Sequence, residues 1–327
     1  MRFGLPVLSI LLMLPAMLPG GAGSAGERHA ATFTVRDEDL AAPLKLVGYG
    51  DMRFTAPSET SATNPVVRRA LVAKIAAENP AAIFIDGDLT WHGVEADYEA
   101  FRDETGPWRE GHLRVYPALG NHEFAQCAEE QCLDRWWQAF PELRGRRWYS
   151  VALGSKVLGI ALDSDVSLLP GSAQRTWLEN EIAALGRKVR FVLIVMHHPP
   201  VADEQSGRQA DHNPRTNERS LAEYLSTVAP RSAARFAVCA GHIHNYERFT
   251  EGGVVYLVSG GGGATPYEVE RARADQYQRG EFPNYHYVRF DIRRDRVVGE
   301  MIRLADPAAP APREWQTADR FEISLRP

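Results

Sequence analysis

The chain lacks three features, each of which would point to a particular kind of protein. It has only three cysteines in 327 residues, so a fold held mainly by disulfide bonds is excluded and a packed core must support it. Its formal net charge is −5, so no basic excess indicates a nucleic-acid-binding patch or an anionic membrane as partner. Internal repeats and low-complexity tracts are also missing beyond the first residues. The rest, 44% hydrophobic and 24% charged, is ordinary globular composition.

The N-terminus has an apolar run that is too short to span a membrane. Arg2 precedes this run, which extends from Leu5 to Leu14, prolines interrupt it, and small residues fill 20–26. A spanning helix needs about 20 apolar residues, whereas a positive start, a short apolar stretch and small residues are typical of a secretory signal. We therefore expect a signal peptide over 1–25, a secreted or periplasmic location, and no membrane anchor after cleavage.

The positions of the cysteines fit a protein that is exported to an oxidising compartment. Cys127 and Cys132 lie five residues apart in a polar stretch, and an oxidising compartment favours a local disulfide between them. Cys239 lies inside the apolar run 236–240, which indicates a buried and unreactive thiol.

Apolar runs of strand length alternate with amphipathic stretches along most of the chain. We expect strands over 44–47, 82–85, 113–118, 148–153, 157–162, 189–196, 236–240, 254–259, 287–292, 297–304 and 321–325. We expect helices over 65–78, 95–104, 129–140, 172–185 and 219–228. The run 189–196 is almost wholly apolar, as is typical of a strand that is buried on both faces.

This alternation predicts an α/β domain. The last strands follow one another without helices between them, which argues against a single parallel sheet. We therefore expect a four-layer αββα sandwich, in which two mixed β-sheets lie face to face with helices outside. One domain over 26–327 would contain this fold, with its core over about 44–305.

Five short segments place metal-binding side chains at a turn after an apolar run. They are Gly50-Asp51-Met52-Arg53, Gly87-Asp88-Leu89, Gly120-Asn121-His122-Glu123, His197-His198-Pro199 and Gly241-His242-Ile243-His244. Carboxylate, amide oxygen and neutral imidazole are ligands of divalent metals. A single Gly-Asp pair is often only a turn, but all five in this order, at strand ends where α/β sheets bind ligands, predict a two-metal centre. Such centres suit in-line displacement at phosphorus.

In this order the motifs resemble those of the calcineurin-like metallophosphoesterases, with features of the purple acid phosphatase branch. The resemblance runs from about 44 to 263 and includes His-His-Pro-Pro at 197–200 and Gly-His-Ile-His-Asn-Tyr-Glu-Arg at 241–248. It implies an αββα fold and a secreted phosphoesterase that hydrolyses monoesters or diesters through metal-bound hydroxide. The substrate would be a small-molecule or peptide phosphoester, and the two ions would be iron, manganese or zinc.

The resemblance also implies a role for each motif residue. The ligands would be Asp88 shared by both metals, Asp51 and His244 on the first metal, and Asn121, His197 and His242 on the second. His122 would lie beside the phosphate, where it stabilises the transition state or protonates the leaving oxygen. Glu123 would orient His122 and tune its charge.

Two positions depart from the family's pattern. Most of the family has a histidine where this chain has Arg53, and purple acid phosphatases have a tyrosine where it has Trp91. A guanidinium stays protonated and an indole N–H only donates, so the first metal would keep three protein ligands. Arg53 is then either an ion-pair partner of a nearby carboxylate or a bidentate clamp on the substrate phosphate.

Three further histidines have open roles. We expect His92 to be a turn residue rather than a ligand, and His198 to be a filler before two prolines rather than a support for the ligands. His212 lies in the polar loop 203–216, either solvated or as a substrate-binding proton donor. The missing ligand also motivates a second hypothesis, an envelope protein of the same fold that binds metal or phosphate and has weakened catalysis. Retention of His122 argues against it.

Overall fold

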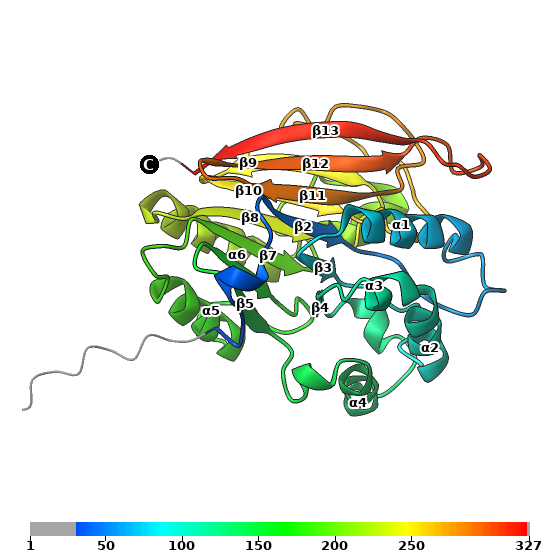
Figure 1. Cartoon of the computed structure of the whole chain (residues 1–327), viewed down its shortest axis with the longest axis horizontal. Coiled ribbons are helices and arrows are strands. Elements are labelled where there is room, and N and C mark those ends of the chain that lie inside the picture. Colours follow the sequence, from blue (N-terminus) through cyan, green and yellow to red (C-terminus); the bar gives the residue numbers. More distant parts are fainter. Residues whose placement is uncertain (1–30, 326–327) are drawn as a thin grey trace, which may run out of the picture. The chain divides into compact units, whose positions relative to one another are not determined.

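Two mixed β-sheets form the centre of the structure, a computed structural model that describes residues 31–325 (Figure 1). The signal peptide expected over 1–25 lies outside these residues. The seven-stranded sheet has the order β1 (Phe33–Val35), β5 (Tyr149–Leu153), β6 (Val157–Ala161), β7 (Phe191–Met196), β8 (Arg235–Ala240), β10 (Val254–Ser259) and β9 (Tyr246–Glu251). The six-stranded sheet has the order β13 (Trp315–Ser324), β12 (Arg296–Leu304), β11 (His286–Ile292), β2 (Leu44–Tyr49), β3 (Ala82–Asp86) and β4 (Val115–Ala118).

Each sheet combines parallel and antiparallel pairs. Strands β6, β7 and β8 run parallel, whereas β9 pairs antiparallel with β10. Strands β2, β3 and β4 also run parallel, and β11, β12 and β13 extend that sheet as antiparallel neighbours. The mixed sheets and the two predicted hairpins, β5–β6 and β11–β12, are therefore confirmed.

Helices cover the outer faces of both sheets (Figure 1). They are α1 (Pro65–Glu78), α2 (Glu95–Glu104), α3 (Gly106–Glu110) and α4 (Glu129–Ala139), with α5 (Ala173–Ala183) and α6 (Thr216–Val228) on the seven-stranded sheet. Leu178 of α5 and Leu221 of α6 share a buried cluster with Ile194 of β7, while Leu71 of α1 belongs to the cluster that includes β2 and β3. The predicted αββα sandwich is confirmed. Within residues 31–325, no helix combines the length and the apolar character that crossing a bilayer requires.

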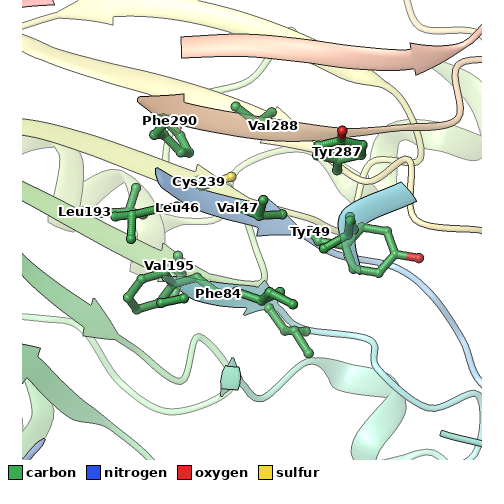
Figure 2. Close-up of a cluster of buried hydrophobic side chains, with 14 of the residues drawn as sticks. Leu46, Val47, Tyr49, Phe84, Leu193, Val195, Cys239, Tyr287, Val288 and Phe290 are labelled. Carbon is green, nitrogen blue, oxygen red and sulfur yellow. The ribbon is translucent and has the colours of Figure 1, made fainter. Parts of the chain in front are cut away.

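Strand β7 shows how the sequence produces this layering. Its side chains alternate between the two faces of the sheet. Val192 and Ile194 pack beneath α5 and α6, whereas Leu193 and Val195 face the other sheet, near Phe290 (Figure 2). All six residues of β7 are buried, and each large apolar side chain contributes about 1.5–3 kcal/mol by leaving water. This confirms the prediction of a strand buried on both faces.

Helix α1 has the predicted bounds because its ends carry specific signals. The Asn64 side chain accepts a hydrogen bond from the Val67 N–H at 3.1 Å, and Pro65 occupies the first position. Asn79 closes the helix with a left-handed φ of 48°, a conformation that asparagine tolerates better than most residues. Helix α6 begins at Thr216, before the expected residue 219, because Glu218 accepts a hydrogen bond from the Arg215 N–H.

The sequence did not predict strands β1 and β9, helix α3 or the first part of β13. β1 and α3 are too short to show periodicity. β9 and the start of β13 lie at sheet edges, where polar residues are exposed and no continuous apolar pattern is needed. β1 and β13 also belong to the sheets although they lie outside 44–305.

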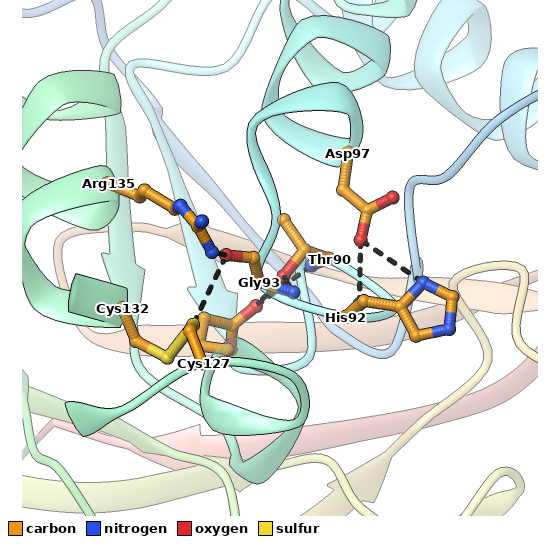
Figure 3. The surroundings of a disulfide bond; sticks show 8 residues. Thr90, His92, Gly93, Asp97, Cys127, Cys132 and Arg135 are labelled. Carbon is orange, nitrogen blue, oxygen red and sulfur yellow. Dashed lines mark hydrogen bonds and ion pairs between the residues drawn. A yellow bond between two sulfur atoms is a disulfide. The ribbon is translucent and has the colours of Figure 1, made fainter.

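The disulfide expected between Cys127 and Cys132 is present. It ties Cys127, in the loop before α4, to Cys132 within that helix. The Gly93 carbonyl accepts a hydrogen bond from Arg135 at 3.1 Å and lies 3.6 Å from the Cys127 sulfur (Figure 3). Cys239 is buried, as predicted, and forms no disulfide; its thiol donates to Asp86 Oδ2 at 3.2 Å.

His286, the first residue of β11, connects the two sheets. Its Nε2 lies 3.1 Å from the Ser259 hydroxyl at the end of β10, and its Nδ1 lies 2.8 Å from the Asn284 carbonyl. The side chain is fully buried, and this burial lowers its pKa to about 4. The folded protein therefore keeps this ring neutral in mildly acidic solution.

We predict that His286 makes the protein less stable as the pH falls from about 6.5 towards 4. In that window the unfolded chain binds a proton at this site while the folded chain does not, so protonation favours unfolding. Relative to His286→Gln, the wild type should lose about 2 kcal/mol of unfolding free energy between pH 7 and pH 5. Urea titrations at both pH values measure this, and equal pH dependence in the two proteins would contradict it.

Candidate metal centre

The five predicted turns lie at the carboxyl ends of neighbouring parallel strands. Each turn immediately follows its strand, with Asp51 after β2, Asp88 after β3, Asn121 after β4, His197 after β7 and His242 after β8. Strands β2, β3 and β4 belong to one sheet, and β7 and β8 belong to the other. Both sheets therefore deliver potential ligands to one place, as the sequence predicted.

Several of these turns use a backbone conformation that most residues avoid. Asp51, Arg53, Asp88 and His242 have φ values of 57°, 50°, 49° and 72°, in the left-handed region. Backbone hydrogen bonds hold the turns in place, including one from the Arg53 N–H to the Asp88 carbonyl at 3.0 Å. Gly241 permits a close approach between two turns, because a Cβ there would lie 2.3 Å from Asp51 Oδ2. Such strain persists where the surrounding structure requires it, commonly at functional sites.

Three potential ligand atoms lie within 3.2 Å of His197 Nε2, and we call Asp88, Asn121, His197 and His242 the second group. His197 Nε2 lies 2.9 Å from Asn121 Oδ1 and 3.2 Å from both Asp88 Oδ1 and His242 Nδ1. Atoms that bind one metal at about 2.0–2.2 Å lie about 3 Å or slightly more apart. The carbonyl of Asp86 lies 3.2 Å from His197 Nδ1, so a proton there leaves Nε2 free to bind a metal. This group fits a metal ion.

Asp51, Asp88 and His244 form what we call the first group, with one ligand atom from each within 4.8 Å of the others. Asp51 Oδ1 and His244 Nε2 lie 3.4 Å apart, and both are buried without a hydrogen-bond partner among the described residues. Each such atom costs about 1–3 kcal/mol if nothing satisfies it. The Thr265 carbonyl, 2.7 Å away, accepts from His244 Nδ1, so Nε2 carries the lone pair. The two unsatisfied atoms therefore fit a cation.

The electrostatics keep Asp88 and His244 in the protonation states that bind metals, whereas Asp51 reaches that state fully only with a cation beside it. Burial alone would raise the pKa of Asp88, but His197, His122 and Arg53 hold it below its usual range. Burial lowers the pKa of His244 to about 3, so the ring is neutral. Burial raises the pKa of Asp51 to about 7, against the opposing effect of His197. A cation would favour the ionised form of Asp51.

The structure places His122 beside the shared carboxylate but gives Glu123 a different task from the expected one. His122 Nε2 lies 3.8 Å from Asp88 Oδ2, while its Nδ1 is 2.8 Å from the Trp91 carbonyl. Its ring stacks on Trp91 at 4.4 Å. Glu123 instead accepts from the backbone N–H groups of Asp88, Thr90 and Gly120 and from the Thr90 hydroxyl. Trp91 therefore orients His122, and Glu123 ties two ligand-bearing turns together.

Arg53 pairs with the shared carboxylate. Its Nε and Nη2 lie 3.3 and 3.2 Å from Asp88 Oδ2, and its guanidinium lies 4.7 Å from the Trp91 ring centroid. The side chain is only 12% exposed. The structure thus shows Arg53 as an ion-pair partner of a nearby carboxylate, one of the two roles that the sequence left open. Trp91, which takes the place of a tyrosine ligand, supports both Arg53 and His122.

The remaining histidines divide into a turn residue and two neighbours of the centre. His92 faces Asp97, as expected of a turn residue (Figure 3). His198 places a ring nitrogen within 4.8 Å of nitrogens of His197 and His242, so it is more than a filler. Its Nδ1 is 2.8 Å from the Ser164 hydroxyl. The His212 ring lies 4.8 Å from that of His242 and is half-buried rather than free in solvent.

Two residues near the centre escaped the sequence prediction. Asp86 ends β3 and is fully buried; burial and Asp51 raise its pKa well above the usual range. Tyr267 stacks near His212 and His244 and donates to the His242 carbonyl at 3.3 Å. Asp86 looked like an ordinary strand end, and Tyr267 lies in a loop without a readable pattern.

Comparison with known proteins places this geometry among phosphoesterases. The sequence profile described as "Calcineurin-like phosphoesterase" matches residues 63–246. A curated relative described as probable purple acid phosphatase 20, from Arabidopsis thaliana, is 28% identical over 268 residues, which cover 75% of this chain and 56% of the relative. The chain thus spans just over half the length of that relative.

Solved structures show the same fold. A purple acid phosphatase, PPD1, from yellow lupin (Lupinus luteus) seeds has a TM-score of 0.67 at 18% identity, over 86% of this chain and 53% of its own. A dimetal phosphatase from Danio rerio has a TM-score of 0.58 at 13% identity, over 86% of this chain and 99% of its own. At these identities the likeness shows the fold alone.

We predict that Mn²⁺ or Zn²⁺ stabilises the folded protein, because a cation satisfies the buried ligand atoms of both groups. At a hundredfold excess over Kd, the gain of about 2.7 kcal/mol should raise Tm by roughly 5 °C. His242→Ala should lose most of this rise, whereas His92→Ala, which alters a residue facing Asp97, should keep it. Differential scanning calorimetry measures the shifts. An equal rise in wild type and His242→Ala would show that the ions bind elsewhere.

Proposed function

The chain belongs to the calcineurin-like phosphoesterase family, and we propose that it is a secreted or periplasmic, metal-dependent hydrolase of phosphate monoesters or diesters. The observation that carries this proposal is the convergence of the two ligand groups on Asp88. A carboxylate with one oxygen beside His197 and the other beside Arg53 and His122 can join two cation positions. Such a pair suits chemistry at phosphorus.

The two groups would hold two ions of iron, manganese or zinc. Asn121, His197 and His242 would bind the second ion, Asp51 and His244 would bind the first, and Asp88 would be shared. When bound, such ions polarise phosphoryl oxygens and lower the pKa of water.

The chain's own residues would position the phosphate ester and handle its charge. The stack on Trp91 and the contact of Nδ1 with the Trp91 carbonyl fix the His122 ring, so Nε2 faces the shared carboxylate. We propose that His122 stabilises the phosphoryl group in the transition state or protonates the leaving oxygen. Glu123 keeps His122 in place indirectly, through the turns at Asp88 and Gly120.

Arg53 and His212 are proposed contacts of the substrate phosphate. Asp88 and the Trp91 ring hold the Arg53 guanidinium beside the shared carboxylate. His212 ends a short 3-10 helix, Gly207–His212, and its ring lies beside His242. Both groups offer N–H donors suited to phosphate oxygens.

Arg53 also makes the two metal positions unequal. Its fixed positive charge shares Asp88 Oδ2 with the first group, which has only three protein ligands. The second group has four ligands, and no arginine or lysine in the described part of the chain contacts its Asp88 oxygen. We therefore propose that the first ion binds more weakly than the second.

The alternative function is a metal- or phosphate-binding envelope protein in which catalysis has weakened. The three-ligand first group is the observation that favours it. The ordered position of His122 weighs against it, because a binding protein does not need an imidazole fixed beside the shared carboxylate.

We predict that Asn121→Ala and His122→Ala each lower kcat/KM for a hydrolysed phosphoester by about a hundredfold or more. Asn121→Ala removes a metal ligand, and His122→Ala removes the group nearest the phosphate. The matched control is His112→Asn, which alters an exposed histidine with a left-handed φ of 52°. Steady-state assays on a panel of monoesters and diesters provide the measurement. Near-normal rates in both alanine variants would contradict the proposal. No turnover by the wild type on any ester would favour the alternative, a metal- or phosphate-binding protein.

We predict that Arg53→His tightens the first metal position at least tenfold, because it replaces a competing cation with a fourth ligand. Isothermal titration with Mn²⁺ and plasma emission of the purified protein give affinity and stoichiometry independently of activity. Arg53→Lys, which keeps the charge, is the control and should resemble the wild type. If the Arg53→His variant binds no more ions than the wild type, and binds them no more tightly, then Arg53 does not weaken metal binding at the first position.

A further inference from the structure

A cavity of about 320 Å³ opens beside the second metal position. Its lining residues are Asn121, Phe124, Cys127, Glu129, Arg147 and Asp165. Asn121 belongs to the second group of ligands, and Phe124 ends the same short helical turn, Asn121–Phe124. A substrate whose phosphate reaches the centre would therefore have room in this cavity for its alcohol part.

The single cation in the lining is already neutralised. Arg147 Nε lies 2.5 Å from Asp163 Oδ2, and Arg147 also contacts Glu129. Its guanidinium lies 5.2 Å from the Phe124 ring centroid, over one face of that ring. Arg147 thus has two carboxylates against its one positive charge, and it has little attraction left for an anionic ligand.

Asp165 adds a carboxylate that no arginine or lysine contacts within residues 31–325. The backbone N–H of Asp165 donates to Asp163 Oδ1 at 2.9 Å. The Asp165 carboxylate lies 3.8 Å from His198 Nδ1, and its side chain is 21% exposed. The nearby Arg215 is bound to both oxygens of Glu218. Burial and Asp163 raise the pKa of Asp165 to about 7, and a bound cation would lower it. The lining therefore carries net negative charge when Asp165 is ionised.

We propose that this cavity binds the leaving alcohol and selects alcohols that carry a positive charge, so the preferred substrate is the phosphate monoester of an amino alcohol. An ammonium group there lies beside Asp165 and near Glu129, in a lining with net negative charge, whereas a carboxylate or second phosphate meets repulsion. The methylene groups of a short amino alcohol suit the apolar wall formed by Phe124 and the disulfide at Cys127. This inference rests on the proposed function, because it assigns the phosphate to the metal centre.

Three esters of similar size test the charge preference directly. They are phosphoethanolamine, propyl phosphate and phosphoglycolate, which place an ammonium, a methyl and a carboxylate group near the same point. Calorimetric titration of the Mn²⁺-loaded His122→Ala variant at pH 8 measures binding while hydrolysis is slow. We expect phosphoethanolamine to bind about fivefold more tightly than propyl phosphate, as for a partly exposed ion pair, and phosphoglycolate to bind more weakly than both.

Variants connect this preference to the cavity. Adding Asp165→Asn or Glu129→Gln should bring the ratio of the phosphoethanolamine and propyl phosphate dissociation constants towards one. Adding Glu223→Gln, which lines a different cavity, should leave the ratio unchanged. Equal binding of the three esters, or a ratio that Asp165→Asn does not alter, would overturn the inference. Failure of the proposed function has a separate signature, because the wild type would then not turn over p-nitrophenyl phosphate. The ratio of the phosphoethanolamine and propyl phosphate dissociation constants decides the inference in either case.

Discussion

The charge of Asp88, held away from water, is the constraint around which the centre is organised. An ionised carboxylate with no solvent exposure is costly unless cations and donors compensate it. Here Arg53 pairs with one oxygen, and the backbone N–H of His122 donates to the other. The neutral rings of His197 and His122 also face the carboxylate, and bound metal ions would supply the remaining positive charge. Glu123 holds the backbone of this turn. The strained turns, the glycines beside them and the layering of the two sheets all serve to bring these groups to one carboxylate.

Much of this arrangement could be predicted because it is encoded locally. The apolar run of β7 specifies a strand buried on both faces, and Asn64 and Pro65 specify where α1 begins. Parallel strands in one sheet end at the same edge, so ligand residues that follow successive strands must meet. For that reason the ligand residues within each sheet could be expected to lie together, and the comparisons confirm the family that this order resembles.

What could not be predicted depends on contacts between distant segments. Glu123 is one residue from His122 in the chain, yet its carboxylate reaches back to the turn at Thr90. The Trp91 carbonyl, instead of Glu123, contacts and orients the His122 ring. Arg53 had two plausible partners, and only the folded chain shows Asp88 as its neighbour. Asp165 and Arg147 carry no motif at all. Their spacing in the sequence says nothing about the cavity that they share beside Asn121.

The most direct test of the account is anomalous diffraction at the manganese edge from crystals of the protein grown with Mn²⁺. The account predicts a strong peak at about 2.0–2.2 Å from Asp88 Oδ1, Asn121 Oδ1, His197 Nε2 and His242 Nδ1. A weaker peak should lie between Asp51 Oδ1, Asp88 Oδ2 and His244 Nε2. The absence of a peak at both positions, or a stronger peak in the first group, would contradict a metal centre that is shared through Asp88 and made unequal by Arg53.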